Sequence, residues 1–380
     1  MKILLTNHHL ALLGGTETAA YTLALALRGA GHEVSIATVE PGAVSEALEK
    51  VGFEVAVDLG EWRGRGFDVI HAHHNAMALT ARYHFPRTPM IFVGHGVLPE
   101  LEQPPSVDLG IGVFAGVSEE VRDAWRHKHG IEDTEVVRNA VDCERFHPRE
   151  PVGAALKRVL VLSNHFPDEL RAVVGKACDQ VGAEIGYCGL EDGAVWNTEE
   201  AVNAADLVIS LGRGIVEAMA CGRAALVFDW HGADGIVTAD NYQEIRKHNF
   251  SGRRFRRELD AEGLAEEMRK YQPEMGETNR ALALEHHDIR KAVSHYEEIY
   301  RRAIDAGVPD GLPPLPGPEI EAFQHMWREH VALKADARRL ASEHQRLRME
   351  LDSIRPRVRS MMWRLEEERR LLKKDLEKGR

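Results

Sequence analysis

Short apolar runs alternate with helix-like segments along the first 306 residues. Strand-like runs are expected at 2–6, 33–38, 68–72, 90–93 and 112–117, and again at 158–162, 184–187, 206–210 and 224–228. Each apolar run is short, which is typical of strands buried within a parallel sheet. A helix with 3.6-residue periodicity is expected at 17–28, directly after the first strand. The alternation predicts βαβ units and therefore an α/β fold.

The two series of strands predict two Rossmann-like domains, at 1–150 and 151–306. Their boundary falls in the Pro-Arg-Glu-Pro segment at 148–151. Ligands of parallel sheets bind at the carboxyl ends of the strands, so a two-domain arrangement places the site in a cleft between the domains. A segment rich in proline and glycine follows at 307–318, and we expect it to be a semi-rigid linker.

The tail at 319–380 carries a heptad pattern of apolar residues. With Phe323 at position a, 12 of the 15 a and d positions through residue 372 are apolar, and the exceptions are His330, His344 and Glu368. The pattern predicts an α-helical coiled coil that makes the chain a homo-oligomer or docks it to a partner. An amphipathic helix folded back on the body is the alternative. Histidines at two a positions predict an assembly that loosens below about pH 6.

Charge and cysteine content narrow the classes of function. The chain has 380 residues and a net charge of 48 − 60 = −12; the tail carries 16 basic and 12 acidic residues, so the first 318 residues carry −16. This charge argues against a nucleic-acid partner, even though 249–257 is a basic, aromatic run. The excess of cations in the tail permits a peripheral membrane contact, and no apolar run is long enough to predict a membrane span. Four widely spaced cysteines fit a cytoplasmic location.

Two glycine-containing segments follow strands and are candidates for phosphate binding. Gly14 and Gly15 lie between the first strand and its helix, where free amides and the helix dipole suit a phosphate or a sugar hydroxyl. Further along, a turn formed by Gly212, Arg213 and Gly214 precedes a helix with Glu217 in its first turn. The turn could hold a diphosphate, and Glu217 could accept the hydroxyls of a ribose. A plain tight turn and a helix-stabilising glutamate remain the alternatives.

The chain resembles the family 4 retaining glycosyltransferases, which have the GT-B fold. The match is carried in order by Gly-Gly-Thr-Glu at 14–17, Gly-His-Glu-Val at 31–34, Asp-Val-Ile-His-Ala-His at 68–73, Gly-His-Gly at 94–96, Val-Ser-Glu-Glu-Val at 117–121, the segment 138–148 and Glu-Ala-Met-Ala-Cys-Gly at 217–222. The resemblance implies two Rossmann-like domains facing a cleft, with a helix at about 285–306 that crosses back onto the first domain.

The resemblance also implies an activity and a set of site residues. The expected reaction moves a sugar from a nucleotide-diphosphate sugar to a hydroxyl of a glycan or small-molecule acceptor, with retention at the anomeric carbon and no cofactor or metal. His95 and Glu217 are the expected catalytic residues, with His95 facing the transferred sugar and Glu217 binding the ribose. The other expected donor-binding residues lie in three segments that follow strands, and they are Gly14, Gly15, Ser163, Asn164, Gly212, Arg213 and Gly214.

The sequence departs from the family pattern at two places. The family has a second acid eight residues before the glutamate, where this chain has Ile209. The family's Arg and Lys after the first strand of the second domain are missing, and Ser163-Asn164 occupies that segment. Arg213 and Arg171 are the candidates to replace these charges. Two other functions therefore stay open: a sugar-nucleotide epimerase with the same fold, and a non-catalytic scaffold that acts through the coiled coil.

The many histidines do not form a metal-binding pattern. His71 and His73 share one face of a strand, His74 points away, and the sequence has no HExxH motif. The neighbouring pair His8 and His9 cannot easily present one face. We therefore expect no metal site.

Overall fold

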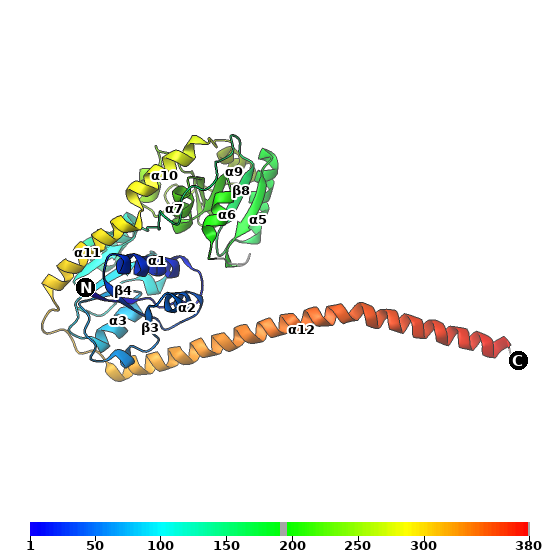
Figure 1. Ribbon diagram of the computed structural model, residues 1–380, viewed down its shortest axis with the longest axis horizontal. Coiled ribbons are helices and arrows are strands. Elements are labelled where there is room, and N and C mark those ends of the chain that lie inside the picture. Colours follow the sequence, from blue (N-terminus) through cyan, green and yellow to red (C-terminus); the bar gives the residue numbers. More distant parts are fainter. Residues whose placement is uncertain (191–195, 379–380) are drawn as a thin grey trace. The chain divides into compact units, whose positions relative to one another are not determined.

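The computed structural model describes residues 1–190 and 196–378. The chain divides into two units, Met1–Ile320 and Glu321–Arg380. The first unit holds two β-sheets with their helices, and the second consists of the main part of one long helix (Figure 1). The α/β expectation is confirmed.

The first sheet has seven strands, all paired in parallel, in the order β3-β2-β1-β4-β5-β6-β7. The strands are β1 (Lys2–Thr6), β2 (Glu33–Ala37), β3 (Glu54–Ala56), β4 (Val69–His73), β5 (Met90–Gly94), β6 (Val113–Gly116) and β7 (Thr134–Val136). The sequence pattern missed β3 and β7, because three residues at a sheet edge are too few to show a periodicity.

The second sheet has five strands in the order β12-β11-β10-β8-β9. They are β8 (Arg158–Leu162), β9 (Glu184–Cys188), β10 (Leu207–Ser210), β11 (Ala224–Asp229) and β12 (Gly232–Ile236). Four strands are parallel, but β12 returns antiparallel to β11 after a tight turn. The sequence pattern predicts no strand at 232–236, so β12 is an addition to the four expected parallel strands. A hairpin needs a turn of only a few residues, whereas a parallel neighbour needs a long crossover.

Helices cover the two sheets. They are α1 (Gly15–Gly29), α2 (Ala43–Lys50), α3 (Asn75–His84), α4 (Glu119–His129), α5 (Asp168–Val181), α6 (Thr198–Ala204), α7 (Gly212–Ala220), α8 (Tyr242–Arg246), α9 (Ala261–Met268), α10 (Glu274–His286) and α11 (Ile289–Ala306), with short 3-10 turns at Leu59–Trp62 and Glu100–Glu102. The helix expected at 285–306 begins later, because Asp288 caps α11 by accepting a hydrogen bond from the amide of Arg290.

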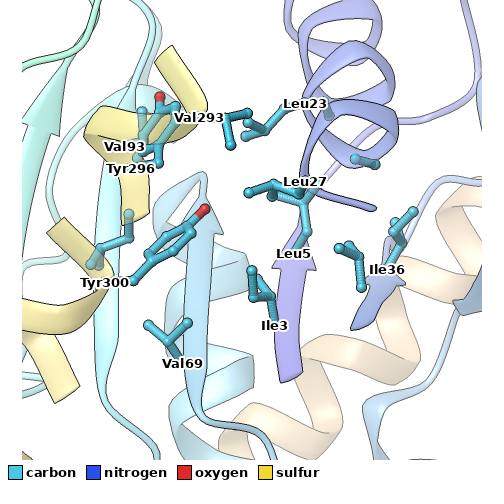
Figure 2. Packing of buried hydrophobic residues seen from close by; sticks show 14 of the residues in the cluster. Ile3, Leu5, Leu23, Leu27, Ile36, Val69, Val93, Val293, Tyr296 and Tyr300 are labelled. Atoms are coloured by element: carbon cyan, nitrogen blue, oxygen red, sulfur yellow. The ribbon is translucent and has the colours of Figure 1, made fainter. Parts of the chain in front are cut away.

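Helix α11 packs on the first sheet, although it follows the second sheet in the chain. Its apolar face supplies Val293, Tyr296 and Tyr300 to the core of the first sheet. Figure 2 shows these side chains in one cluster with residues of α1 and of the strands, such as Leu27 and Val69. The hydroxyl of the buried Tyr300 lies 2.6 Å from Nδ1 of His71 on β4. The chain thus crosses between the sheets twice.

The chain after α11 leads into a helix of 62 residues, α12 (Gly317–Lys378). This helix begins inside the segment that the sequence predicts as linker, and Ile320 in its first turn is buried. Among the described residues, no helix combines the length and the apolar character that a membrane span requires.

Candidate functional site

A pocket of about 270 Å³ opens where the carboxyl ends of strands from both sheets meet. Its walls come from the segment after β1, the chain that connects the two sheets, and the segments after β8, β9 and β10. The lining residues are Leu13, Gly14, Gly15, Thr18, Tyr21, Thr22, Arg145, Phe146, Leu162, Ser163, Asn164, Trp196, Thr198, Ser210, Leu211, Arg213, Gly214 and Glu217. Six predicted donor-binding residues and Glu217 therefore line or border one cavity.

Gly14 and Gly15 form the edge of the pocket at the N-terminus of α1. Gly14 is the N-cap residue and Gly15 is the first helical residue, with no side-chain cap. A Cβ on Gly15 would meet open space, whereas one on Gly14 would lie 2.2 Å from a carboxylate oxygen of Glu17. The positive end of the helix therefore faces the pocket, with the Glu17 carboxylate beside it.

Ser163 and Asn164 follow β8 directly and line the opposite wall of the pocket. The Asn164 side chain donates to the carbonyl of Leu13 (2.9 Å) and accepts from the amide of Leu190 (3.2 Å). This asparagine therefore connects the two sheet-forming halves of the unit across the pocket. Its amide cannot supply the positive charge that the family places in this segment.

The Gly-Arg-Gly segment is the first turn of a helix, and the expectation of a loop before the helix is wrong. Helix α7 begins at Gly212, whose φ of 51° suits glycine. The amide of Gly212 donates to the carbonyl of Phe250 (3.0 Å), and the amide of Gly214 donates to that of Leu211 (3.1 Å). These two amides are therefore already bonded within the protein. Gly212 itself is not among the residues that line the pocket.

Glu217 forms a buried ion pair with Arg213, one helical turn earlier. Nε of Arg213 lies 3.0 Å from Oε1 of Glu217, and the two side chains are 8% and 11% exposed. The Arg213 guanidinium also donates to the carbonyl of Ala140 (2.7 Å) and to the hydroxyl of Thr22 (3.0 Å) on α1. Burial raises the pKa of the Glu217 carboxyl, while Arg213 opposes that shift. Arg213 thus joins the two halves of the unit.

The second oxygen of Glu217 is less engaged. Oε2 has the Thr198 hydroxyl as its neighbour, at 3.5 Å, which is the limit of a hydrogen bond. A ligand hydroxyl could therefore approach this oxygen while Oε1 stays paired with Arg213.

Ile209 points away from the pocket. It lies in β10, is fully buried, and packs in the apolar cluster that contains Leu207 and Leu226. Because neighbouring strand residues face opposite sides of a sheet, Ser210 lines the pocket while Ile209 faces this core. An acid at position 209 would therefore be buried among apolar side chains.

His95 lies outside the main pocket. It borders a separate hollow of about 30 Å³, together with His73 and Asn139. Its Nε2 lies 2.8 Å from Nδ1 of His73, and its backbone amide donates to Glu102 (2.6 Å). Burial lowers the pKa of His95, so the imidazole is neutral at pH 7. The catalytic role expected for His95 stays a prediction.

Among the pocket-lining side chains that sequence reasoning missed are Tyr21, Arg145 and Trp196. The rings of Tyr21 on α1 and Trp196 after β9 lie 5.0 Å apart. Arg145, in the connecting chain, pairs with Glu199 (2.8 Å) and donates to the carbonyl of Trp196. The position of Trp196 after a strand of the second sheet was an available signal, because that edge of the sheet carries the site.

Arg171, the other proposed replacement cation, lies against Tyr187 with its guanidinium 4.4 Å from the ring centre. Within the described ranges, no three histidine, cysteine or acidic side chains are placed to hold a metal ion. The histidines interact with one another and with their neighbours: the ring centres of His71 and His73 lie 4.6 Å apart with the rings tilted by 33°, and His74 lies 3.5 Å from Glu102.

Comparisons with known proteins agree with this architecture. Residues 13–145 match the model of Glycosyltransferase Family 4. A comparison with curated proteins finds no match. Among solved structures, HepE of Anabaena in complex with UDP and glucose is similar, with a TM-score of 0.59 at 17% identity over 79% of this chain and 99% of that chain.

Two further structures share the fold. A mutant of TarM from S. aureus, in complex with Fondaparinux, alpha-GlcNAc-glycerol and UDP, has a TM-score of 0.53 at 10% identity over 79% of this chain and 99% of that chain. An alpha-glucosyltransferase in complex with UDP and a 13-mer DNA has a TM-score of 0.50 at 10% identity, with the same coverage. The chain therefore has the GT-B fold of glycosyltransferases, and its residues 13–145 match Glycosyltransferase Family 4.

Proposed function

We propose that this protein is a retaining glycosyltransferase that moves a sugar from a nucleotide-diphosphate sugar to an acceptor hydroxyl during assembly of a glycan or glycoconjugate. The observation that carries the proposal is the single pocket that collects Gly14, Gly15, Asn164 and Glu217 from both sheets. The UDP complexes among the similar structures support UDP as the first donor nucleotide to test.

Glu217 is proposed to hold the ribose. Glu217 lines the pocket, and its Oε2, 3.5 Å from the Thr198 hydroxyl, can accept a hydrogen bond from a ribose hydroxyl while Arg213 keeps Oε1 in place. A hydrogen bond to a buried, charged acceptor is stronger than one between neutral groups. The ion pair thus orients Glu217 for this contact.

The departing diphosphate needs positive charge, which the pocket offers at three places. The N-terminus of α1 at Gly15 presents its dipole, and Arg145 and Arg213 line the same cavity, each in an ion pair with a glutamate. Fixed dipoles and cations that face developing negative charge lower the barrier to departure of the leaving group. His95 is proposed to contact the transferred sugar as a neutral hydrogen-bonding group.

A non-catalytic scaffold is the second candidate. Two observations favour it: Ile209 occupies the position of the family's other acid and faces the core, and Arg213 already pairs with Glu217. In this case the pocket would bind no donor, and the chain would act through its long helix.

We propose a cytoplasmic location, because the four cysteines are free and buried, as expected in a reducing compartment. A peripheral contact of the basic tail with anionic lipids stays a prediction.

The test is release of nucleoside diphosphate from UDP-, GDP-, ADP- and TDP-sugars, with and without a panel of acceptor glycans. The transferase predicts turnover that needs an acceptor and, by NMR, a product with the anomeric configuration of the donor. Donor turnover without any acceptor would support the epimerase instead. No turnover and no nucleotide binding would support the scaffold. Glu217→Gln should lower the turnover at sub-saturating donor by about 10- to 100-fold, whereas Glu262→Gln on the surface of α9 is the matched control.

A further inference from the structure

The second unit, Glu321–Arg380, exposes an unpaired apolar stripe along α12. The helix has 62 residues, which corresponds to a length of about 93 Å. Nine described residues at a and d heptad positions are 39% to 68% exposed, namely Phe323, Met326, Leu333, Leu340, Leu347, Leu351, Ile354, Met361 and Leu365. A regular stripe of this length loses its contact with water only when another helix covers it.

We propose that α12 pairs with α12 of a second copy of this chain, parallel and in register, as a two-stranded coiled coil. The proposal goes beyond the enzyme activity and does not depend on it. Two features of the helix select this occupant and this orientation: the charges that flank the stripe and the polar residues within it.

The flanking charges favour a parallel pair. In a parallel coiled coil, each g residue faces the e residue five positions later on the other helix. Glu329 would face Lys334 of the partner subunit, Glu343 would face Arg348 of the partner subunit, and Glu350 would face Arg355 of the partner subunit. Basic residues at positions 364 and 369 add one like-charge pair. Counted on both sides, six pairs attract and two repel.

The best antiparallel alignment is less favourable. There, Glu329, Glu343 and Glu350 face the basic g positions 378, 364 and 357, respectively. Counted on both sides, these contacts also give six attractive pairs. However, e positions then face each other, so Lys334 meets position 369 and Arg348 meets Arg355, which makes four like-charge pairs. Like charges in contact across a helix pair are destabilising.

The polar residues within the stripe give a second, independent argument. In parallel register, His330, His344 and the acidic position 368 each meet their own copies, so polar groups face polar groups along the seam, with one like-charge contact at position 368. In the antiparallel alignment, His344 would lie opposite Met361 and Ala337 would lie opposite an acidic position, 368. Polar a residues that pair with each other fix the register of a coiled coil.

Cysteine cross-linking of the full chain tests this proposal. Leu340→Cys places a thiol in the seam, where in a parallel, in-register dimer it meets its own copy. Ala335→Cys is the matched control, because position 335 is at f, on the far side of the helix. The four natural cysteines are buried, so they do not compete with the introduced thiol for disulfide formation.

The proposal predicts a dimer of the unmodified chain in sedimentation experiments. Under mild oxidation, the proposal predicts that Leu340→Cys forms a disulfide-linked dimer and that Ala335→Cys forms little of it. Position 340 would meet position 365 in the antiparallel alignment. Cross-linking only in a mixture of Leu340→Cys with Leu365→Cys would therefore overturn the orientation. A monomer at micromolar concentration, or a mass above that of a dimer, would overturn the pairing itself.

Discussion

Arg213 and Glu217 offer the sharpest test of how the pocket is held together. The pair lies in α7 at an N–O distance of 3.0 Å with both side chains about nine-tenths buried. The perturbation is a double-mutant cycle made of Arg213→Met, Glu217→Gln and the two together. Arg213→Met also removes the hydrogen bonds to Ala140 and Thr22, which connect α7 to the other half of the unit.

The magnitude follows from burial. Removal of one partner leaves the other charge uncompensated, which costs about 3–5 kcal/mol of unfolding free energy for a buried pair. The double variant leaves no unpaired charge, so its loss should be smaller than the sum of the single losses by roughly 2 kcal/mol. We expect the Arg213→Met variant to be the less stable of the two single variants, because it loses three hydrogen bonds.

Urea unfolding followed by tryptophan fluorescence measures the coupling. The matched control is the cycle Arg269→Met with Glu262→Gln, whose N–O distance is also 3.0 Å but whose side chains are 48% and 61% exposed. Exposed pairs contribute little, so its coupling should stay below about 0.5 kcal/mol. An equally small coupling for Arg213 and Glu217 would refute the reasoning, because it would mean that water screens the pair.

Three further predictions concern stability. Gly214→Ala should cost about 1–3 kcal/mol, because its Cβ would lie 2.1 Å from the Ser210 hydroxyl oxygen, whereas Gly175→Ala in α5, with open space, should be neutral or stabilising. Burial lowers the pKa of His287 from 6.5 to about 3, so only the unfolded chain gains this proton as pH falls below 6.5. Lowering the pH from 6.5 to 4.5 should therefore reduce the unfolding free energy of both proteins, but the reduction should be roughly 2 kcal/mol smaller in His287→Gln than in the parent. Equal reductions in the two proteins would contradict the assignment. Burial raises the pKa of Asp229 to about 6 from 3.8, so its contribution to stability is lost as pH rises from about 4 to 6. Asp229→Asn should thus gain stability relative to the parent at pH 7 but not at pH 4, and a gain of equal size at both values would contradict it.

The architecture was predictable because it follows from repeated local patterns. Short apolar runs with helices between them predict the strands of a parallel sheet wherever the run is long enough, as at β1 and β10. The antiparallel β12 was missed because its sequence, Gly-Ala-Asp-Gly-Ile, has few of the residues that favour strands. The break between α10 and α11 depends on a single cap at Asp288, which sequence periodicity does not reveal.

The composition of the pocket was predictable in part. Residues after strand ends, such as Gly14, Asn164 and Glu217, come together because parallel strands end at one edge of their sheet. The pairing of Arg213 with Glu217 was not predicted, because Arg213 was expected in a turn before the helix, whereas both residues lie in α7 at a spacing of four residues. The separation of His95 from the pocket was not, because it depends on how the His73 and Glu102 side chains pack around it.

Calorimetric titration of the full chain with UDP, GDP, ADP and TDP tests the central claim most directly. We expect one of these nucleotides to bind. A hydrogen bond to the charged Glu217 contributes about 1.5–3 kcal/mol, so Glu217→Gln should weaken that binding by about 10- to 100-fold. Glu262→Gln should leave it unchanged. Failure of every nucleotide to bind, or an unchanged affinity in Glu217→Gln, would contradict the assignment of this pocket as the donor site.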